Sequence, residues 1–145
     1  MRVNALRLWA IPALLWLAAC ATTPPESEQG LLAPSEEQTK LRNMQTRTFE
    51  VASREEALRG IIAALQDLGF IIERANEPLG LVTASRFAEP NFYDVLSVTV
   101  TARAQAAGGM LIRANAIYNN EPVTDPEVYR NFFTTLERSM FIDRN

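Results

Sequence analysis

The stretch DVLSVTVTAR, residues 94–103, alternates apolar and polar residues more regularly than any other part of the chain. A period of two residues is typical of a β-strand that has one buried face and one solvated face. The positions predicted to face the core are Leu96, Val98, Val100 and Ala102, and those predicted to face solvent are Ser97, Thr99, Thr101 and Arg103. This strand predicts a sheet that is covered on one side only.

Further strands are predicted on both sides of this stretch. Residues 76–80, NEPLG, form a turn signal between two apolar segments and therefore predict a hairpin. The complete set of predicted strands is 45–51, 70–75, 81–86, 94–103 and 110–118. In the last strand the predicted inner positions are Met110, Ile112, Ala114, Ala116 and Tyr118.

Two amphipathic helices are predicted from their end signals. The first begins at a capping box formed by Ser53 and Glu56, and it ends at Gly69 in a left-handed conformation. The second opens at Asp125-Pro126, an N-cap residue followed by a proline in the first turn. Their apolar stripes are Leu58, Ile61, Ile62, Leu65 and Leu68, and Tyr129, Phe132, Phe133, Leu136 and Met140.

The predicted element order is β-α-β-β-β-β-α. We predict an α+β fold in which an antiparallel sheet of four to five strands carries two helices on one face, a helix-grip-like arrangement. The chain divides into residues 1–19, residues 20–43 and a single domain at residues 44–145. Residues 21–43 are rich in Pro, Ser, Thr, Glu and Gln without a sustained period, so we predict a flexible tether there.

The first nineteen residues are organised like a secretory signal peptide. Arg2 and Arg7 precede an apolar run at residues 8–19, LWAIPALLWLAA. A membrane-spanning helix is the alternative interpretation, but it needs roughly 20 apolar residues. This run is shorter and contains Pro12, so export is favoured.

Residues 17–20, LAAC, resemble the lipobox of bacterial lipoproteins, an aliphatic residue and two small residues followed by cysteine. The resemblance implies lipid transfer to the Cys20 thiol and cleavage between Ala19 and Cys20. Two or three acyl chains would anchor the protein stably in a membrane, whereas an unmodified thiol is the alternative. Ala21, in place of aspartate, favours the outer membrane under the enterobacterial sorting rule. We expect a lipid-anchored envelope protein that faces the periplasm.

The rest of the chain resembles a family of small, uncharacterised proteobacterial lipoproteins. The matching stretches are MQTR (44–47), LQDLGF (65–70), LGLVTAS (79–85) and DPEVYRNFFTTLERSMF (125–141). Those relatives carry a longer, glycine-containing insert after the third strand, where this chain has only FAEPNFY (87–93). The element order is also similar to the helix-grip domains of BamC, an accessory lipoprotein of the outer-membrane β-barrel assembly machine. A shared architecture does not imply a shared function.

The composition excludes several kinds of chemistry. The chain has no histidine and one cysteine, so it lacks the commonest general base and zinc ligand, and it cannot form an internal disulfide. The net charge is −3, and it becomes −5 when Arg2 and Arg7 are removed with the signal segment. An acidic protein is poorly suited to binding nucleic acid, whose phosphates are negatively charged. We predict a non-catalytic protein without cofactor or metal.

Three groups of residues are candidate binding surfaces. The loop aromatics Phe87, Phe92 and Tyr93 would form a partner-binding patch or fold over the open end of the core. The polar sheet face would receive a partner or glycan or simply be solvated, and it consists of Thr99, Thr101, Arg103, Arg113 and Asn115. The last helix would line a groove for an acyl chain or peptide, or pack as core, through Tyr129, Phe132, Phe133 and Met140.

These observations favour a membrane-anchored accessory or interaction module of the cell envelope, whose partner is an unidentified envelope protein. The alternative is a periplasmic carrier or sensor that holds a small apolar ligand between the sheet and the last helix. An enzyme would require a pair of carboxylates in a cleft, which a sequence does not reveal.

Overall fold

The computed structural model describes residues 34–88 and 93–142. They belong to one compact unit, Pro34–Asn145. This unit has its own hydrophobic core, so we expect it to fold without the preceding residues. The predicted signal segment, Cys20 and Phe92 lie outside the described residues.

The sheet has six strands, all paired antiparallel, which confirms the predicted α+β class. The strand order is β1-β5-β4-β3-β2, and β6 also pairs with β5. The strands are β1 (Thr46–Phe49), β2 (Ile71–Asn76), β3 (Leu81–Phe87), β4 (Val95–Ala104), β5 (Met110–Tyr118) and β6 (Glu121–Pro122). The sixth strand, β6, was not predicted, because two residues are too few to show a period.

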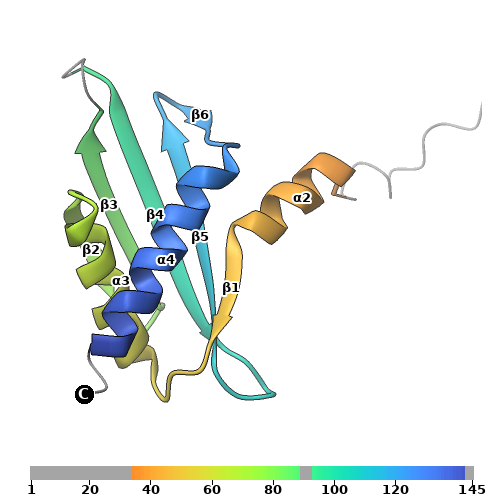
Figure 1. The fold of residues 1–145 in the computed structure, drawn as a ribbon, viewed down its shortest axis with the longest axis vertical. Helices are drawn as coiled ribbons and strands as arrows, with labels where there is room; N and C mark the ends of the chain where they lie inside the picture. Colours follow the sequence, from red (N-terminus) through yellow and green to blue (C-terminus); the bar gives the residue numbers. More distant parts are fainter. Residues whose placement is uncertain (1–33, 89–92, 143–145) are drawn as a thin grey trace, which may run out of the picture. The chain divides into compact units, whose positions relative to one another are not determined.

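Among the described residues, three helices accompany the sheet: α2 (Glu36–Met44), α3 (Arg54–Asp67) and α4 (Pro126–Ile142). Figure 1 shows α3 and α4 side by side on the same face of the sheet, as the sequence predicts. The largest fully buried side chains come from both helices and the sheet: Tyr129, Phe133, Ile61, Leu65, Ile112, Leu136, Val82 and Val100. Among the described helices, none is long and apolar enough to cross a bilayer.

Strand β4 confirms the alternation that predicted the sheet, since its four apolar positions are all buried. One position on β5 was predicted wrongly. Tyr118 was placed on the inner face, but it is 40% exposed. A phenol needs a hydrogen-bond partner, and the Tyr118 hydroxyl finds one at the surface by donating to Asp94 Oδ2 at 2.8 Å. This bond raises the pKa of Tyr118.

The predicted helix ends are confirmed by local hydrogen bonds. The Ser53 hydroxyl accepts a bond from the backbone N–H of Glu56 at 3.1 Å. The Glu56 carboxylate accepts from the N–H of Ala52, so only the Ser53 half of the predicted capping box forms. Gly69 has φ +78°, and the N–H of Phe70 donates to the Leu65 carbonyl at 2.9 Å, which completes a Schellman end. Asp125 begins α4 by accepting from the backbone N–H two residues later. Neighbouring residues therefore encode where α3 and α4 start and where α3 stops.

The flexible tether predicted for residues 20–43 is wrong over its last part, where α2 lies. Ser35 and Gln38 form a reciprocal capping box, each side chain bonding the other's backbone N–H at 3.2 Å. Leu41 and Met44 pack against the core from the far end of this helix. The helix was missed because two apolar residues do not establish a stripe, so the folded domain begins about ten residues earlier than predicted.

Candidate functional site

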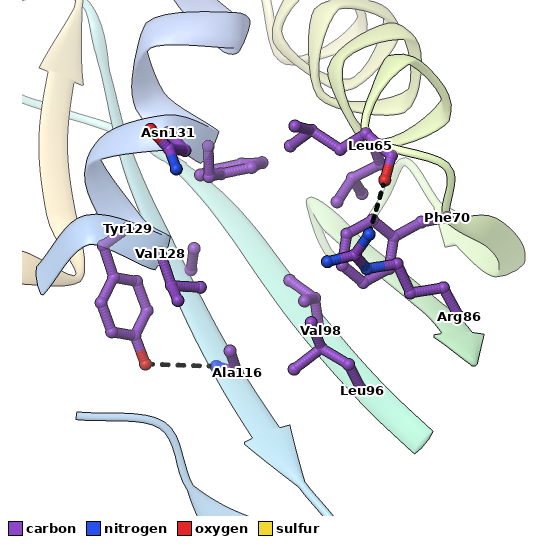
Figure 2. A pocket seen from close by; sticks show the side chains of 12 residues that line it. Leu65, Phe70, Arg86, Leu96, Val98, Ala116, Val128, Tyr129 and Asn131 are labelled. Atoms are coloured by element: carbon purple, nitrogen blue, oxygen red, sulfur yellow. Dashed lines mark hydrogen bonds between the residues drawn. The ribbon is translucent and has the colours of Figure 1, made fainter. Parts of the chain in front are cut away.

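An apolar cavity of about 160 Å³ lies between the sheet and the two helices that cover it. Figure 2 shows that its lining comes from α3, α4 and the strands beneath them. The lining residues are Leu65, Leu68, Phe70, Arg86, Leu96, Val98, Ala114, Ala116, Val128, Tyr129, Asn131 and Phe132. A cavity of about 150 Å³ in a protein core is large enough to bind benzene. The space therefore suits an apolar group of about that size.

Two alanines on β5 leave the room for this cavity. Ala114 pairs with Val100 and Ala116 pairs with Val98, and all four side chains lie on the buried face of the sheet. A methyl group is the shortest apolar side chain, so the sheet side of the cavity projects least into the space at these two positions. The larger side chains of the helices above, such as Phe132, form the wall of the space and do not fill it.

Hydrogen bonds hold Tyr129 in its place in the cavity wall. Its hydroxyl donates to the Val123 carbonyl at 2.7 Å and accepts from Gln45 Nε2 at 3.1 Å. The N–H of Ala116 also points to this oxygen, at 3.4 Å, as Figure 2 shows. With its donor and acceptor both engaged, the Tyr129 side chain is held in one orientation.

Gln45 is a buried polar residue that the sequence analysis did not single out. Its amide nitrogen donates to Tyr129 and to Asn115 Oδ1, and its oxygen accepts from Arg113 Nη2 at 3.3 Å. Gln45 thus connects the polar face of the sheet to the cavity wall. Gln45 is the C-cap residue of α2 with an αR backbone, not a strand residue as the sequence predicted, so strand alternation gave no signal for its inward side chain.

Arg86 is the charged residue of the cavity lining. It follows Val82 and Ala84 at the same parity on β3, and both of these are fully buried. The guanidinium lies 5.1 Å from the centre of the Phe70 ring and donates to the Leu68 carbonyl at 3.4 Å. Arg86 was not predicted as a site residue, although an arginine at an inward-facing strand position was the available signal.

The loop aromatics are not in the cavity. Phe87 is 61% exposed and Tyr93 is 95% exposed, so these two do not fold over the core. Phe87 shares a shallow surface hollow with Ile71, which is 68% exposed. Phe92 is outside the described residues. Of the aromatic residues predicted to form a patch, Phe87 and Tyr93 are therefore at the surface, and Phe87 lies next to an apolar residue of the edge strand β2.

The polar face predicted from sequence is brought together on the sheet surface opposite α3 and α4. Thr99 pairs with Asn115 and Thr101 pairs with Arg113 across β4 and β5. Together with Arg103 and Leu111 these residues surround a shallow depression. The last-helix stripe, by contrast, divides into two roles: Tyr129 and Phe132 line the cavity, whereas Phe133 and Met140 are ordinary core.

Within residues 34–88 and 93–142, no cluster of three His, Cys, Asp or Glu side chains is placed to hold a metal ion. No protein-family model matches the sequence, and no match was found among curated proteins. The fold and site define a small α+β domain with an apolar cavity between its helices and its sheet.

Proposed function

We propose that this protein is a lipid-anchored protein of the bacterial cell envelope whose domain binds a small apolar ligand. The observation that carries the proposal is the cavity of about 160 Å³ beneath α3 and α4. Protein interiors are normally packed without voids much larger than a water molecule. The space is partly open to solvent, so its apolar lining is in contact with water and a bound apolar ligand would bury that surface.

The anchor is supported by the N-terminal sequence. A lipobox-like LAAC follows an apolar run of the length found in signal peptides. Acyl chains on Cys20 would hold the domain at the periplasmic surface of a membrane, most simply the outer membrane. The ligand site would then lie close to a source of apolar molecules.

Ligand binding is tested on the domain alone, residues 34–145, by methyl NMR with hexan-1-ol as the apolar probe. We expect chemical-shift changes at the methyl groups of the cavity, such as those of Val98 and Ala116. The methyl groups of Val51 and Leu58, which are buried but do not line the cavity, are the internal control. Absence of any saturable change, or changes spread over the whole core, would contradict the proposal.

The variant Cys20→Ser is expected to lose all acylation, because a hydroxyl does not replace the thiol that the lipidation reaction uses. Intact-mass measurement after expression in a bacterial host, combined with radiolabelled palmitate, checks this. Ala21→Ser, one residue away, keeps the cysteine and should keep the acyl mass. An unacylated wild-type protein, or palmitate retained in Cys20→Ser, would refute the anchor.

The interaction module predicted from sequence is the second candidate function. Its support is the pair of exposed apolar side chains Ile71 and Phe87, which share a surface hollow, together with the exposed Tyr93. Exposed aromatic residues are the side chains that protein interfaces most often bury at their centres. A photocrosslinking residue at position 93 should then capture one envelope protein in cells, and repeated capture of none would count against this candidate.

A further inference from the structure

We infer that the cavity takes a carboxylate with a short apolar body, and that Arg86 recognises its anionic head. This inference rests on the proposed function and specifies the chemistry of the ligand. The apolar body would occupy the space beneath α3 and α4, and the head would lie at the polar end of the lining.

The backbone of β3 directs Arg86 to the cavity side of the sheet. Arg86 pairs with Leu96, which lines the cavity, and it continues the buried alternation of Val82 and Ala84. Its guanidinium lies over Phe70, itself a wall residue. The charge therefore stands at the border between the apolar lining and solvent, where Arg86 is exposed.

Within residues 34–88 and 93–142, the guanidinium has more donors than its neighbours use. It carries five N–H groups, and its hydrogen bond to the Leu68 carbonyl is long, at 3.4 Å. No carboxylate of the described residues lies within ion-pair distance of Arg86. The planar fork of an arginine matches both oxygens of a carboxylate, so an anionic ligand would supply the missing partner.

The rest of the lining accounts for the apolar body. Apart from Arg86 and Asn131, the lining residues are aliphatic or aromatic. Figure 2 shows Asn131 on α4 and Arg86 on β3 at opposite sides of the space. Asn131 is therefore too far from Arg86 to share one carboxylate with it. A ligand held by Arg86 has its head at that side of the space and a body of about six carbons, the size of benzene, inside.

A purely structural role for Arg86 makes a different prediction. A cation beside the last carbonyls of α3 stabilises the helix end, and its stem packs on Phe70. In that case, removal of the charge would change the stability of the domain but would not alter the preference between a charged and a neutral ligand. The comparison of two ligands that differ only in their heads separates the two roles.

The test compares hexanoate with hexan-1-ol at pH 7 on the domain, residues 34–145, by methyl NMR titration. For the wild type we expect hexanoate to bind more tightly than the alcohol. Arg86→Gln should weaken hexanoate about tenfold and leave hexan-1-ol unchanged, since a charged hydrogen bond is lost. Arg86→Lys should retain part of the preference. Arg103→Gln, which removes an arginine from the opposite face of the sheet, should change neither affinity.

The outcomes separate the two levels of the argument. If neither probe binds the wild type, the proposed function fails and the inference fails with it. If hexan-1-ol binds but hexanoate is not preferred, or if Arg86→Gln leaves that preference intact, the inference is overturned and the proposed function stands. If Arg86→Gln weakens the binding of both probes equally, whether or not its melting temperature changes, the inference is also overturned. Such a result indicates a structural role for Arg86. Arg86→Lys decides the question if Arg86→Gln does not fold.

Discussion

Replacing Ala116 by leucine is expected to abolish ligand binding and to leave the domain folded. Ala116 is buried on the floor of the cavity, opposite Val98 on β4. The three added carbons would extend into empty space and occupy the volume that an apolar ligand needs. Because filling a cavity restores packing contacts, we expect the free energy of unfolding to be unchanged or higher.

Ala102→Leu is the matched control for this cavity-filling variant. Ala102 is equally buried on the same face of the sheet, but it does not line the cavity. Overpacking a filled region costs about 1–3 kcal/mol, so this variant should lose stability. Circular dichroism melts and hexan-1-ol titrations of both variants give the comparison. The prediction is contradicted if Ala116→Leu binds hexan-1-ol normally or loses as much stability as Ala102→Leu. Either result would show that a leucine side chain at position 116 does not fill an empty cavity.

Replacing Gly80 by alanine is expected to destabilise the domain by about 3 kcal/mol or more. Gly80 has φ +63°, and a Cβ placed there would lie 2.2 Å from the backbone oxygen of Ala102. The carbonyl of Gly80 also accepts a hydrogen bond from the N–H of Ala102 at 2.8 Å. Relief of the clash would therefore require the turn to move away from β4 and to lose that bond.

Gly69→Ala separates the clash from the backbone strain. Gly69 has φ +78°, but a Cβ there would meet nothing within 4 Å. The free energy of unfolding should fall only by the cost of placing alanine in the left-handed conformation, about 1–2 kcal/mol. Chemical denaturation of both variants, followed by circular dichroism, measures the difference. If the two losses were equal, the close approach of the turn to β4 would not be a determinant of stability.

The elements that the sequence predicts well are those specified by near neighbours. The alternation in β4 and the capping residues Ser53 and Asp125 act over two to four positions, and the structure confirms each of them. The exceptions have two causes. Helix α2 and strand β6 are short, and the Tyr118 hydroxyl bonds Asp94, 24 residues away in the chain, which the strand period does not reveal.

Less of the candidate site could be predicted. The last-helix residues Tyr129 and Phe132 were proposed to line a groove, and the structure places both in the cavity wall. Gln45 and Arg86 were missed, although Arg86 is a polar residue at an inward-facing strand position; Gln45 is the C-cap residue of a helix that was itself not predicted. That Gln45 bonds Tyr129, 84 residues away, could not be inferred from local spacing.

The sequence by itself determines where most strands and helices lie, which face of each is apolar, and that residues 17–20 carry a lipobox-like motif. Periodicity, capping and motif recognition depend on residues that are close in the chain, so a sequence displays them directly. Only the tertiary structure decides that Ala114 and Ala116 lie beneath a space that the helices leave open, and that Arg86 stands at its edge. A cavity is the volume left when side chains from distant segments pack together, and that remainder is set by their three-dimensional arrangement.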